Sequence, residues 1–548
     1  MKILIQNIES GKYNSYLLLL VIFVSSLRLL NLNFEDMQTW DESLYAVRTL
    51  SIVDHNRWID QTDDALGGLY SSAHPPLLIW LNAISVKSIG DKPFAHRLPT
   101  ALLSIFTILL VFYIPSKRLI GFFSSIILSS FYYFYLFSRS GQLDIAYIFF
   151  ITLGVYYYSN YLNSNENKYV VFTGIVFGLA LYCKIIVGLF LPLGLFTFSI
   201  LNYFVNRNNV EFKTHIKNLV MIVFIGLILF APWFINMFNK YNIQFIDFYF
   251  FYHIKARMSN AIENNGKQLS YAFYFNQLLV YGTYSLPLII IYFNKLKTNK
   301  LFLLAFSVFF VEIIIITISK TKLPTYLLPV FPMIAIMVGL IIEDVISQKK
   351  VSNFVLYILP ICFFWSISND LRISIKSLSF SNYICNPNYV LILTTILFSY
   401  LLISFKNKPR VFGLFVFIFF IIKFVLDEPI ELQKSNLRKV SSLVKKEQIK
   451  KVYYYYSDKR TSYVLNPQLN YYFGENFEFI NIGNRLNEIK SDSIPMNKIT
   501  DLNFLVIIDN DLQNKQNIAK EYSLNTIQTW KDKYYTIYKV SNASINKQ

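Results

Sequence analysis

The chain has 548 residues, of which 54% are hydrophobic, 18% aromatic and only 15% charged. Soluble domains carry about 25% charged residues, so this composition and the repeated apolar runs of about 18 to 22 residues exclude an ordinary soluble protein. The net charge of +18 comes mostly from Lys and Arg in short loops between the apolar runs. Such residues set membrane topology, and no basic groove with interleaved aromatics is found, which excludes a nucleic-acid-binding protein.

The apolar runs predict a polytopic α-helical membrane protein with about 13 transmembrane helices. We place them at roughly 14–32, 97–115, 119–137, 143–162, 168–184, 186–205, 216–234, 270–293, 299–319, 324–345, 352–369, 388–405 and 410–427. No small-residue cleavage site follows the first run, so we expect it to remain as a span. Three scattered cysteines and the lack of a C-x-x-C pattern exclude a disulfide framework and a cysteine metal site.

The positive charges alternate between the loops in a way that indicates orientation. With a cytoplasmic N-terminus, every predicted inner loop is basic, whereas the short outer loops carry fewer positive charges. An odd number of spans then places the C-terminus on the extracytoplasmic side. We therefore expect a multi-pass protein of the cell (inner) membrane with two long outer loops, 33–96 and 235–269.

Both long outer loops contain predicted helices. In the first, DESLYAVRTLSIV predicts an amphipathic helix that begins near Asp41, and the diproline at 75–76 favours a second helix, PPLLIWLNAISV. Gly67 and Gly68 mark a flexible turn between these helices. The aromatics and scattered charges of 235–269 predict a helix that lies at the membrane interface.

Beyond residue 427 the sequence becomes polar and charged. KVYYYYS, FEFINI, NFLVIID and YYTIYKV predict strands, whereas SNLRKVSSLVKKE and DLQNKQNIAKEY predict helices. We therefore expect two domains, a transmembrane domain at 1–427 that includes the loop 33–96, and an extracytoplasmic α/β domain at 428–548. The second domain contains no phosphate loop or catalytic triad, and acceptor docking, a lid or a scaffold all remain open for it.

Acidic residues near the predicted outer face are the first candidates for chemistry. Asp41 and Glu42 form an adjacent pair after the first span, and Asp144 begins the fourth span. A carboxylate at this position can act as a general base or bind a metal through its oxygens. The alternative is structural, since acids in a first helical turn complement the helix dipole, and Asp144 could cap a helix or pair with Arg139.

Cations on the same predicted side form the second candidate group. Lys184 interrupts the apolar sequence YCKIIVGLFLP, Lys322 lies in the turn SKTKLPTYLLP, and Arg257 lies in the second long loop. Each alone could be a snorkelling interface residue, but several on one face indicate a phosphate site at headgroup level. His74, before the diproline, is either structural or an additional donor.

These residues occur in a series of motifs that resembles the bacterial family-39 glycosyltransferases. WDESLYA, HPPLLIWLNAISVKSIGDKPFAHRLPTALLS, SRSGQLDIAYIFF, YCKIIVGLFLPLG and SKTKLPTYLLPVFP follow one another in the order typical of that family. The resemblance covers roughly 14–345. That family includes the lipid A aminoarabinose transferases and is related to the protein O-mannosyltransferases, and all of them belong to the C-type superfamily.

The resemblance implies an integral-membrane transferase that moves a sugar from a polyprenyl-phosphate donor, with inversion, to an acceptor hydroxyl or phosphate. It implies that Asp41 is the base or acceptor-orienting group, supported by Glu42, and that Asp144 lies in the catalytic cavity. His74 stands where the family often has Lys, so its assignment to the donor phosphate departs from the family pattern. The other residues implied in phosphate binding are Lys184, Arg257, Lys322 and Arg139.

No metal-binding motif is present, although related lipid A enzymes bind a metal near the first loop, so the sequence leaves a divalent metal open. Ala73 precedes His74, where an acidic ligand is expected. The acceptor could be lipid A, another glycan, a lipid or a protein. Two other functions stay open: an oligosaccharide ligase or polymerase that uses a lipid-linked glycan, and a lipid-linked sugar flippase. The lack of an obvious internal repeat and the gathering of candidate ionisable groups at one face favour the transferase over a transporter.

Overall fold

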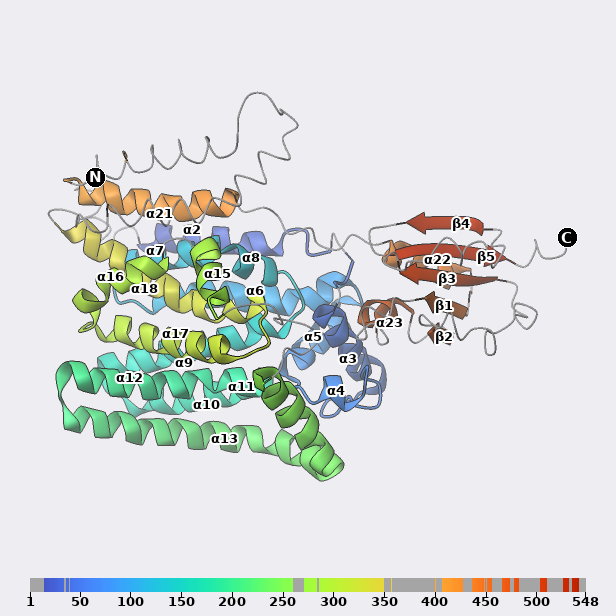
Figure 1. The fold of residues 1–548 in the computed structure, drawn as a ribbon, viewed down its shortest axis with the longest axis horizontal. Coiled ribbons are helices and arrows are strands. Elements are labelled where there is room, and N and C mark those ends of the chain that lie inside the picture. The colour runs from blue at the N-terminus through green and yellow to red at the C-terminus, as the bar shows by residue number, and fades with distance from the viewer. Residues whose placement is uncertain are drawn as a thin grey trace. The chain divides into compact units, whose positions relative to one another are not determined.

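In the computed structural model the chain forms two compact units (Figure 1). Unit 1 comprises Met1–Leu30, Ala73–Leu78 and Leu98–Pro429, and unit 2 comprises Asn31–Ser72, Ile79–Arg97 and Ile430–Gln548. The structure describes residues 14–33, 36–38, 40–259, 271–282, 285–348, 356, 400, 407–426, 436–447, 449, 451–455, 466–473, 478–481, 503–509, 526–531 and 535–541. The spans predicted at 352–369 and 388–405 fall almost wholly outside these residues, and the helix predicted at 511–522 falls entirely outside them.

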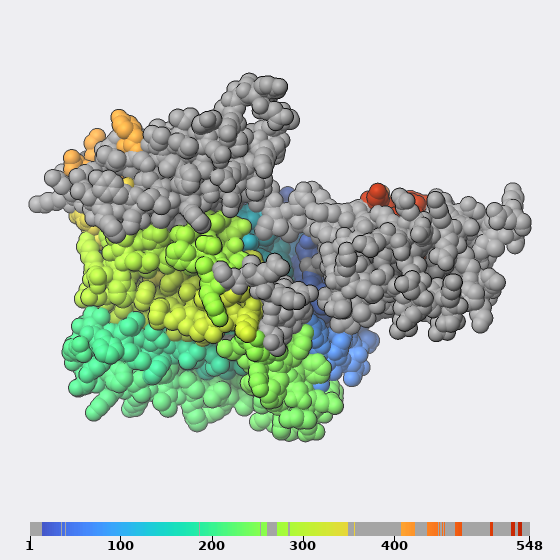
Figure 2. Space-filling model, in the orientation of Figure 1, coloured from blue at the N-terminus to red at the C-terminus, as the bar shows by residue number. Residues whose placement is uncertain are grey.

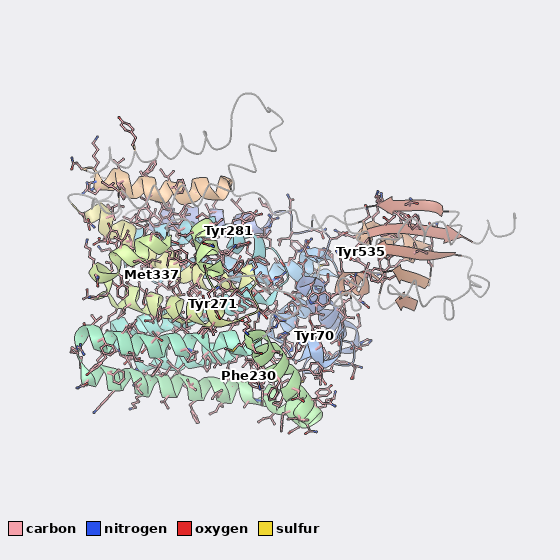
Figure 3. All side chains as sticks on the ribbon, in the orientation of Figure 1. Tyr70, Phe230, Tyr271, Tyr281, Met337 and Tyr535 are labelled. Carbon is pink, nitrogen blue, oxygen red and sulfur yellow. The ribbon has the colours of Figure 1, made fainter. Side chains whose placement is uncertain are left out.

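Unit 1 is built from helices. They are α2 (Asn14–Ser26), η1 (Leu27–Leu29), α6 (Pro93–Tyr113), α7 (Arg118–Ser130), α8 (Tyr132–Phe137), α9 (Leu143–Ser164), α10 (Asn167–Cys183), α11 (Ile185–Gly188), α12 (Phe190–Asn206), α13 (Asn209–Ile246), η2 (Asp247–Ala256), α14 (Arg257–Ser259), α15 (Phe273–Tyr281), α16 (Ser285–Leu296), α17 (Lys300–Ile318), η4 (Pro324–Leu327), α18 (Val330–Ser347) and α21 (Pro409–Leu426). α18 is central, and Met337, labelled in Figure 3, is fully buried among its neighbours.

Four helices are long and apolar enough to cross a membrane, namely Pro93–Tyr113, Asn209–Ser259, Lys300–Ile318 and Val330–Ser347. Seven shorter apolar helices accompany them in the described part of the chain. α13 exposes several large apolar side chains, including Phe224, Leu227 and Ile228. In Figure 2 the part of the chain that contains α13 forms the green lower edge of unit 1. Apolar residues on such a surface suit contact with lipid. The protein is therefore a polytopic helical membrane protein, as predicted, and the total of about 13 spans stays a prediction.

Several helix boundaries follow from local chemistry. Asn208 and Asn299 cap α13 and α17, because each side chain accepts hydrogen bonds from the two amides that begin the next turn. The sequence placed the end of the seventh span at 234, but the helix does not end there. α13 continues to Ile246, with a break in its helical backbone at Asn242. The span predicted at 119–137 is divided at Phe131, whose extended backbone separates α7 from α8.

Ion pairs connect helix ends at one end of unit 1. Lys117 pairs with Glu343, Lys295 with Asp344, and Lys300 with Glu211. These basic residues come from two different loops, around Lys117 and around Lys295–Lys300, that the charge pattern assigned to a common side of the membrane. The structure thus brings these loops to one end of the bundle, which agrees with the predicted alternation; which side of the membrane they face remains a prediction.

Unit 2 combines the first long loop with the C-terminal segment. Its helices are α3 (Asp41–His55), α4 (Leu69–Ser72), most of α5 (Leu77–Ile89), α22 (Leu437–Lys446) and α23 (Pro467–Phe473). Its strands are β1 (Lys451–Tyr455), β2 (Glu478–Asn481), β3 (Asn503–Asp509), β4 (Thr526–Lys531) and β5 (Tyr535–Ser541). The sheet order is β2-β1-β3-β5-β4. β1 pairs in parallel with β2 and β3, whereas β5 pairs antiparallel with β3 and β4.

The helices predicted in the first loop and the four predicted strands are confirmed, whereas β4 and α23 were missed. Gly67 and Gly68 both have positive φ, which glycine adopts without steric cost, so the predicted turn is also confirmed. The sheet and the loop share one hydrophobic core, in which Met37 and Ala46 pack with residues of α22, α23 and the strands. Tyr535, labelled in Figure 3, lies in this core on β5.

Candidate active site

In unit 1, one end of α9 carries a carboxylate beside a lysine. Asp144 lies in the first turn of α9 and is 6% exposed. Its Oδ1 accepts a hydrogen bond from the Tyr147 hydroxyl, 2.9 Å away, and lies 3.9 Å from the Lys184 ammonium. Lys184 has an extended backbone between α10 and α11. The interruption between the two helices therefore lies at the residue whose side chain faces Asp144.

Aromatic rings extend this cluster to a second cation. The Lys184 ammonium lies 5.7 Å from the ring centre of Tyr147 and 5.8 Å from that of Tyr326, which are cation–π distances. The Tyr326 hydroxyl accepts a hydrogen bond from Arg257 Nη1, 2.9 Å away. We call Asp144, Tyr147, Lys184, Tyr326 and Arg257 the α9 cluster. It joins three residues predicted from the sequence to two tyrosines that were missed.

Two other predicted cations bind backbone carbonyls. The Lys322 ammonium donates to the carbonyl oxygens of Thr317 and Ser319, 2.8 and 2.9 Å away, and the residue is 4% exposed. Arg139 donates to the carbonyl oxygen of Leu30 and to the Tyr135 hydroxyl. A helix end leaves its last carbonyl groups without partners, so Lys322 completes the C-terminal end of α17. The structure therefore gives both residues an evident structural role.

His74 lies between α4 and α5 in unit 1 and is half-buried. Glu312, in α17, is a site that sequence reasoning missed. It is fully buried, and neither of its carboxylate oxygens has a hydrogen-bond partner in the described part of the chain. The sequence did contain a signal for Glu312, since it is the one acid in the apolar run FFVEIIII. An ionisable side chain within a membrane span costs free energy, so its presence there indicates a function.

In unit 2, the predicted acid pair divides into two different environments. Asp41 is half-buried in the first turn of α3, where the helix N-terminus favours a negative charge. Glu42 is fully buried and forms a two-pronged ion pair with Arg97, in which Nε lies 2.7 Å from Oε1 and Nη2 lies 2.9 Å from Oε2. Bidentate pairs of this kind fix geometry as well as charge.

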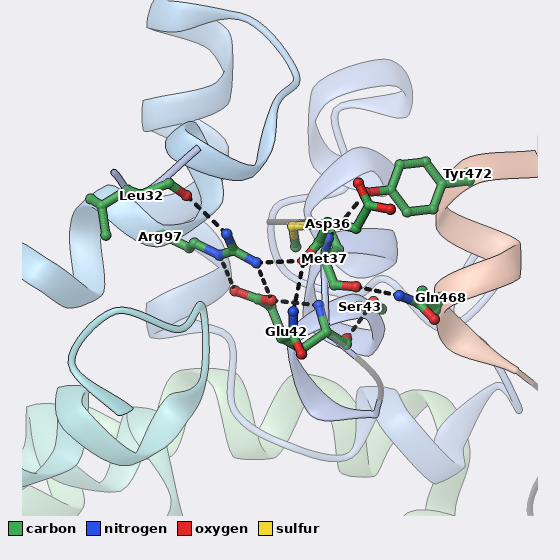
Figure 4. Close-up of polar contacts among 9 residues, drawn as sticks. Leu32, Asp36, Met37, Glu42, Ser43, Arg97, Gln468 and Tyr472 are labelled. Carbon is green, nitrogen blue, oxygen red and sulfur yellow. Dashed lines mark hydrogen bonds and ion pairs between the residues drawn. The ribbon is translucent and has the colours of Figure 1, made fainter. Parts of the chain in front are cut away.

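Further hydrogen bonds make this pair a clamp (Figure 4). Arg97 also donates to the carbonyl oxygens of Leu32 and Asp36, and the Gln38 amide donates to Glu42 Oε2. The Glu42–Arg97 clamp therefore fixes the chain that leads into α3, one residue from Asp41. Sequence reasoning named Glu42 but missed Arg97. The signal was the arginine in FAHRLP, which lies where the same predicted loop meets the next predicted span.

The C-terminal segment reinforces the same chain entry. The Gln468 side-chain amide donates to the carbonyl oxygen of Met37, 2.6 Å away, and the Met37 amide donates to the Tyr472 hydroxyl, 3.0 Å away (Figure 4). Arg438 donates to Asn33. Helices α22 and α23 thus bind the segment that precedes Asp41 from the opposite side to Arg97. Among the residues that the structure describes, no three His, Cys, Asp or Glu side chains gather as a metal site.

Comparison with known proteins shows what this chain is similar to. The family profile for dolichyl-phosphate-mannose-protein mannosyltransferases matches residues 73–235, a segment that contains Asp144 and Lys184. ArnT from Cupriavidus metallidurans, bound to undecaprenyl phosphate, shares the fold with a TM-score of 0.63 at 13% identity, over 97% of this chain and 98% of that one. The same protein in the apo state gives a TM-score of 0.64 at 14% identity, with the same coverage.

Curated relatives agree with that fold. The undecaprenyl phosphate-alpha-4-amino-4-deoxy-L-arabinose arabinosyl transferase of Wigglesworthia glossinidia brevipalpis is 24% identical over 60% of this chain and 59% of its own length. An uncharacterized protein of Aquifex aeolicus (strain VF5) is 24% identical over 75% of this chain and 78% of its own length. The chain is therefore similar to dolichyl-phosphate-mannose-protein mannosyltransferases over residues 73–235 and shares its fold with ArnT. It resembles the lipid A aminoarabinose transferases, as the order of its motifs predicted.

Proposed function

We propose that this membrane glycosyltransferase takes a sugar from a polyprenyl-phosphate donor and transfers it, with inversion, to an acceptor on the extracytoplasmic face. The α9 cluster is the observation that carries this proposal, because it sets a lysine beside a buried carboxylate and connects that lysine through the Tyr326 ring to an arginine. The undecaprenyl phosphate bound to ArnT, a protein of the same fold, supports a donor of that class.

The chemistry of the leaving group explains why cations are needed. As the bond between the sugar carbon and the phosphate oxygen breaks, negative charge grows on the departing polyprenyl phosphate. A fixed cation that faces this charge stabilises the transition state more than the ground state. Lys184 suits this task because its ammonium lies beyond hydrogen-bond distance of Asp144, so its donors remain available for phosphate oxygens.

Arg257 and the tyrosines position this charge. The Arg257 guanidinium donates to the Tyr326 hydroxyl, and the Tyr326 ring is one of the two against which Lys184 packs. The Asp144 carboxylate lies 3.9 Å from the Lys184 ammonium and balances its charge when no donor is bound. We therefore assign Lys184 and Arg257 to the donor phosphate and Asp144 to the orientation of Lys184.

Asp41 is our candidate for the base. Inversion requires the acceptor oxygen to approach the sugar carbon opposite the phosphate, and a carboxylate must receive or orient its proton. Asp41 is suited to this because it is half-buried in the first turn of α3. Glu42 acts through the clamp with Arg97, so we assign it a positioning role.

The test uses the full chain in lipid nanodiscs with defined polyprenyl-phosphate sugars and a membrane lipid extract as the acceptor source. Wild type should release polyprenyl phosphate, and Lys184→Gln and Asp41→Asn should each lower the rate at least about 100-fold. Lys295→Gln is the matched control, because it removes an exposed lysine from an ion pair outside the α9 cluster.

Two outcomes would overturn the proposal. If wild type released no polyprenyl phosphate from any donor, but moved lipid-linked sugars across vesicles, a flippase would replace the transferase. The buried Glu312 would then be a candidate for the transport pathway, because ionisable residues within spans often mark such pathways. If Lys184→Gln released as much as Lys295→Gln, the α9 cluster would not be the phosphate site. Release only from donors that carry a long glycan would indicate a ligase or polymerase.

A further inference from the structure

Unit 2 contains a cavity of about 680 Å³, within the range of about 300–1,000 Å³ that small-molecule sites occupy. Its walls come from α3, from the chain around Asp64, from the end of α5, and from α22 and α23. The lining residues that the argument uses are Leu50, Lys87, Asp91, Lys445, Asn470 and Tyr471. The C-terminal segment and the first loop therefore build this site together.

Asp91 is held in place for binding. Its Oδ1 accepts hydrogen bonds from the Tyr471 hydroxyl, 2.7 Å away, and from His96 Nε2, 2.9 Å away. Both bonds end on the same oxygen, and the side chain is 45% exposed, so the second oxygen can accept a hydrogen bond from a ligand. Burial alone would raise the pKa of Asp91, but His96, Tyr471 and the charge of Lys445 lower it, which keeps the carboxylate ionised.

The charges around the cavity balance each other. Asp54, Asp64 and Asp91 face Lys87 and Lys445 in its lining, together with His55. Asp64 is already paired with Arg57 and His55, and Lys87 packs over the ring of Trp58. A phosphate would need an excess of cations, as the α9 cluster has. This lining instead suits a neutral ligand whose hydroxyl groups meet Asp91 and Asn470, and whose carbon faces meet Leu50 and Tyr471.

The position of the cavity along α3 limits the length of that ligand. Leu50 follows Asp41 by nine residues on one helix, which corresponds to about 14 Å at 1.5 Å per residue. A single sugar bound in the cavity could not reach Asp41, whereas an extended oligosaccharide could. The same helix would then carry the base at one end and a docking site for a remote part of the acceptor.

We propose that this cavity binds a neutral, extended oligosaccharide segment of the acceptor, with the Asp91 carboxylate and the Tyr471 ring as its main contacts. This inference rests on the proposed transferase function and specifies its acceptor class. Such a site raises affinity for the correct acceptor through contacts far from the reacting hydroxyl, and it gives the C-terminal segment a function in recognition.

The first test is retention of the full chain, in labelled nanodiscs, on an array of neutral and phosphorylated oligosaccharides. Wild type should bind neutral oligosaccharides. Leu50→Trp, which fills the cavity, and Asp91→Ala should each weaken retention about tenfold or more, the effect expected from loss of one hydrogen bond to a charged group. Ile84→Trp is the control, since it enlarges an exposed side chain on α5 outside the cavity.

The second test separates this inference from the transferase proposal. With acceptor present, Leu50→Trp should raise the acceptor KM about tenfold, whereas release of polyprenyl phosphate by water, measured without acceptor, should equal that of wild type. Retention of wild type on phosphorylated oligosaccharides alone, or on none, would overturn the cavity assignment even if transfer occurs. Retention that Leu50→Trp leaves intact would do the same. Neutral binding without any release of polyprenyl phosphate would instead overturn the transferase and leave the glycan site.

Discussion

Replacement of Arg97 by Met should unfold unit 2 at much lower denaturant, because the clamp holds a carboxylate that has no access to water. Glu42 is fully buried and the Arg97 side chain is 5% exposed. Removal of one partner of a buried ion pair costs about 3–5 kcal/mol. The carbonyl oxygens of Leu32 and Asp36 also lose a donor, so we expect the upper part of that range.

A single free energy of unfolding is not well defined for a chain with two compact units, so the assay must report on unit 2 alone. Pulse proteolysis of the chain in nanodiscs, at increasing urea and with cleavage followed in the C-terminal segment, meets this need. Arg57→Met is the matched control, because Arg57 pairs with Asp63 and Asp64 in the same unit but is 34% exposed. We expect a loss below about 1 kcal/mol for this control.

A double replacement, Glu42→Leu with Arg97→Met, tests the physical reason. If an unpaired buried charge causes the loss, removing both charges should recover part of the stability that Arg97→Met alone destroys. Equal urea midpoints for Arg97→Met and Arg57→Met, or no recovery in the double variant, would refute the reasoning. The buried Glu42–Arg97 pair would then contribute no more to the stability of unit 2 than an exposed ion pair does.

Three more outcomes follow from the structure. Lys184→Arg should keep part of the transfer activity that Lys184→Gln loses, because the positive charge persists although a planar guanidinium replaces the compact ammonium. An equal loss of activity in both variants would argue against a role for the charge. Lys322→Met should lower stability by about 1–3 kcal/mol, seen in thermal unfolding, with donor KM unchanged, because its ammonium binds carbonyl oxygens. The folded-state pKa of Asp91 lies below its ordinary value of 3.8, so its contribution to unit 2 is present above pH 3.8 and disappears as pH falls through the folded pKa. Proteolysis midpoints near pH 3 should therefore fall in wild type more than in Asp91→Asn, and equal slopes would contradict this.

Much of the architecture could be predicted from local pattern. Apolar runs predicted the helices of unit 1 closely where each helix is continuous, as in α9 and α17. One boundary was misplaced at 234, because the end of an apolar run is not itself a helix stop: α13 contains Pro232 and continues into the outer loop as far as Ile246. β4 was missed although four of the six residues of TIQTWK are β-branched or aromatic, and the pairing of this strand with β5 is visible only in the structure.

The candidate site was predicted in part for a similar reason. Residue type identified Asp144, Lys184 and Arg257, but not the tyrosines that join them, since Tyr147 and Tyr326 lie in a chain rich in tyrosine. Lys322 looks like a phosphate ligand in sequence, and only the structure shows its ammonium on two carbonyl oxygens. The pairing of Glu42 with Arg97 spans 55 residues, a separation that no local pattern encodes.

The shared core of unit 2 means that α3 acquires all of its packing partners only when the C-terminal strands have been synthesised. Met37 and Ala46 pack with Leu505 and Ile537, so α3 leaves the ribosome long before the strands that stabilise it. At about 5–20 residues per second, the roughly 490 residues between Ala46 and Ile537 take on the order of 25 to 100 s to synthesise. During that time the candidate base lies on a helix without its core. A prematurely terminated chain could insert its spans into the membrane and still have no ordered acceptor side, so it would not hydrolyse lipid-linked donors that the cell needs elsewhere.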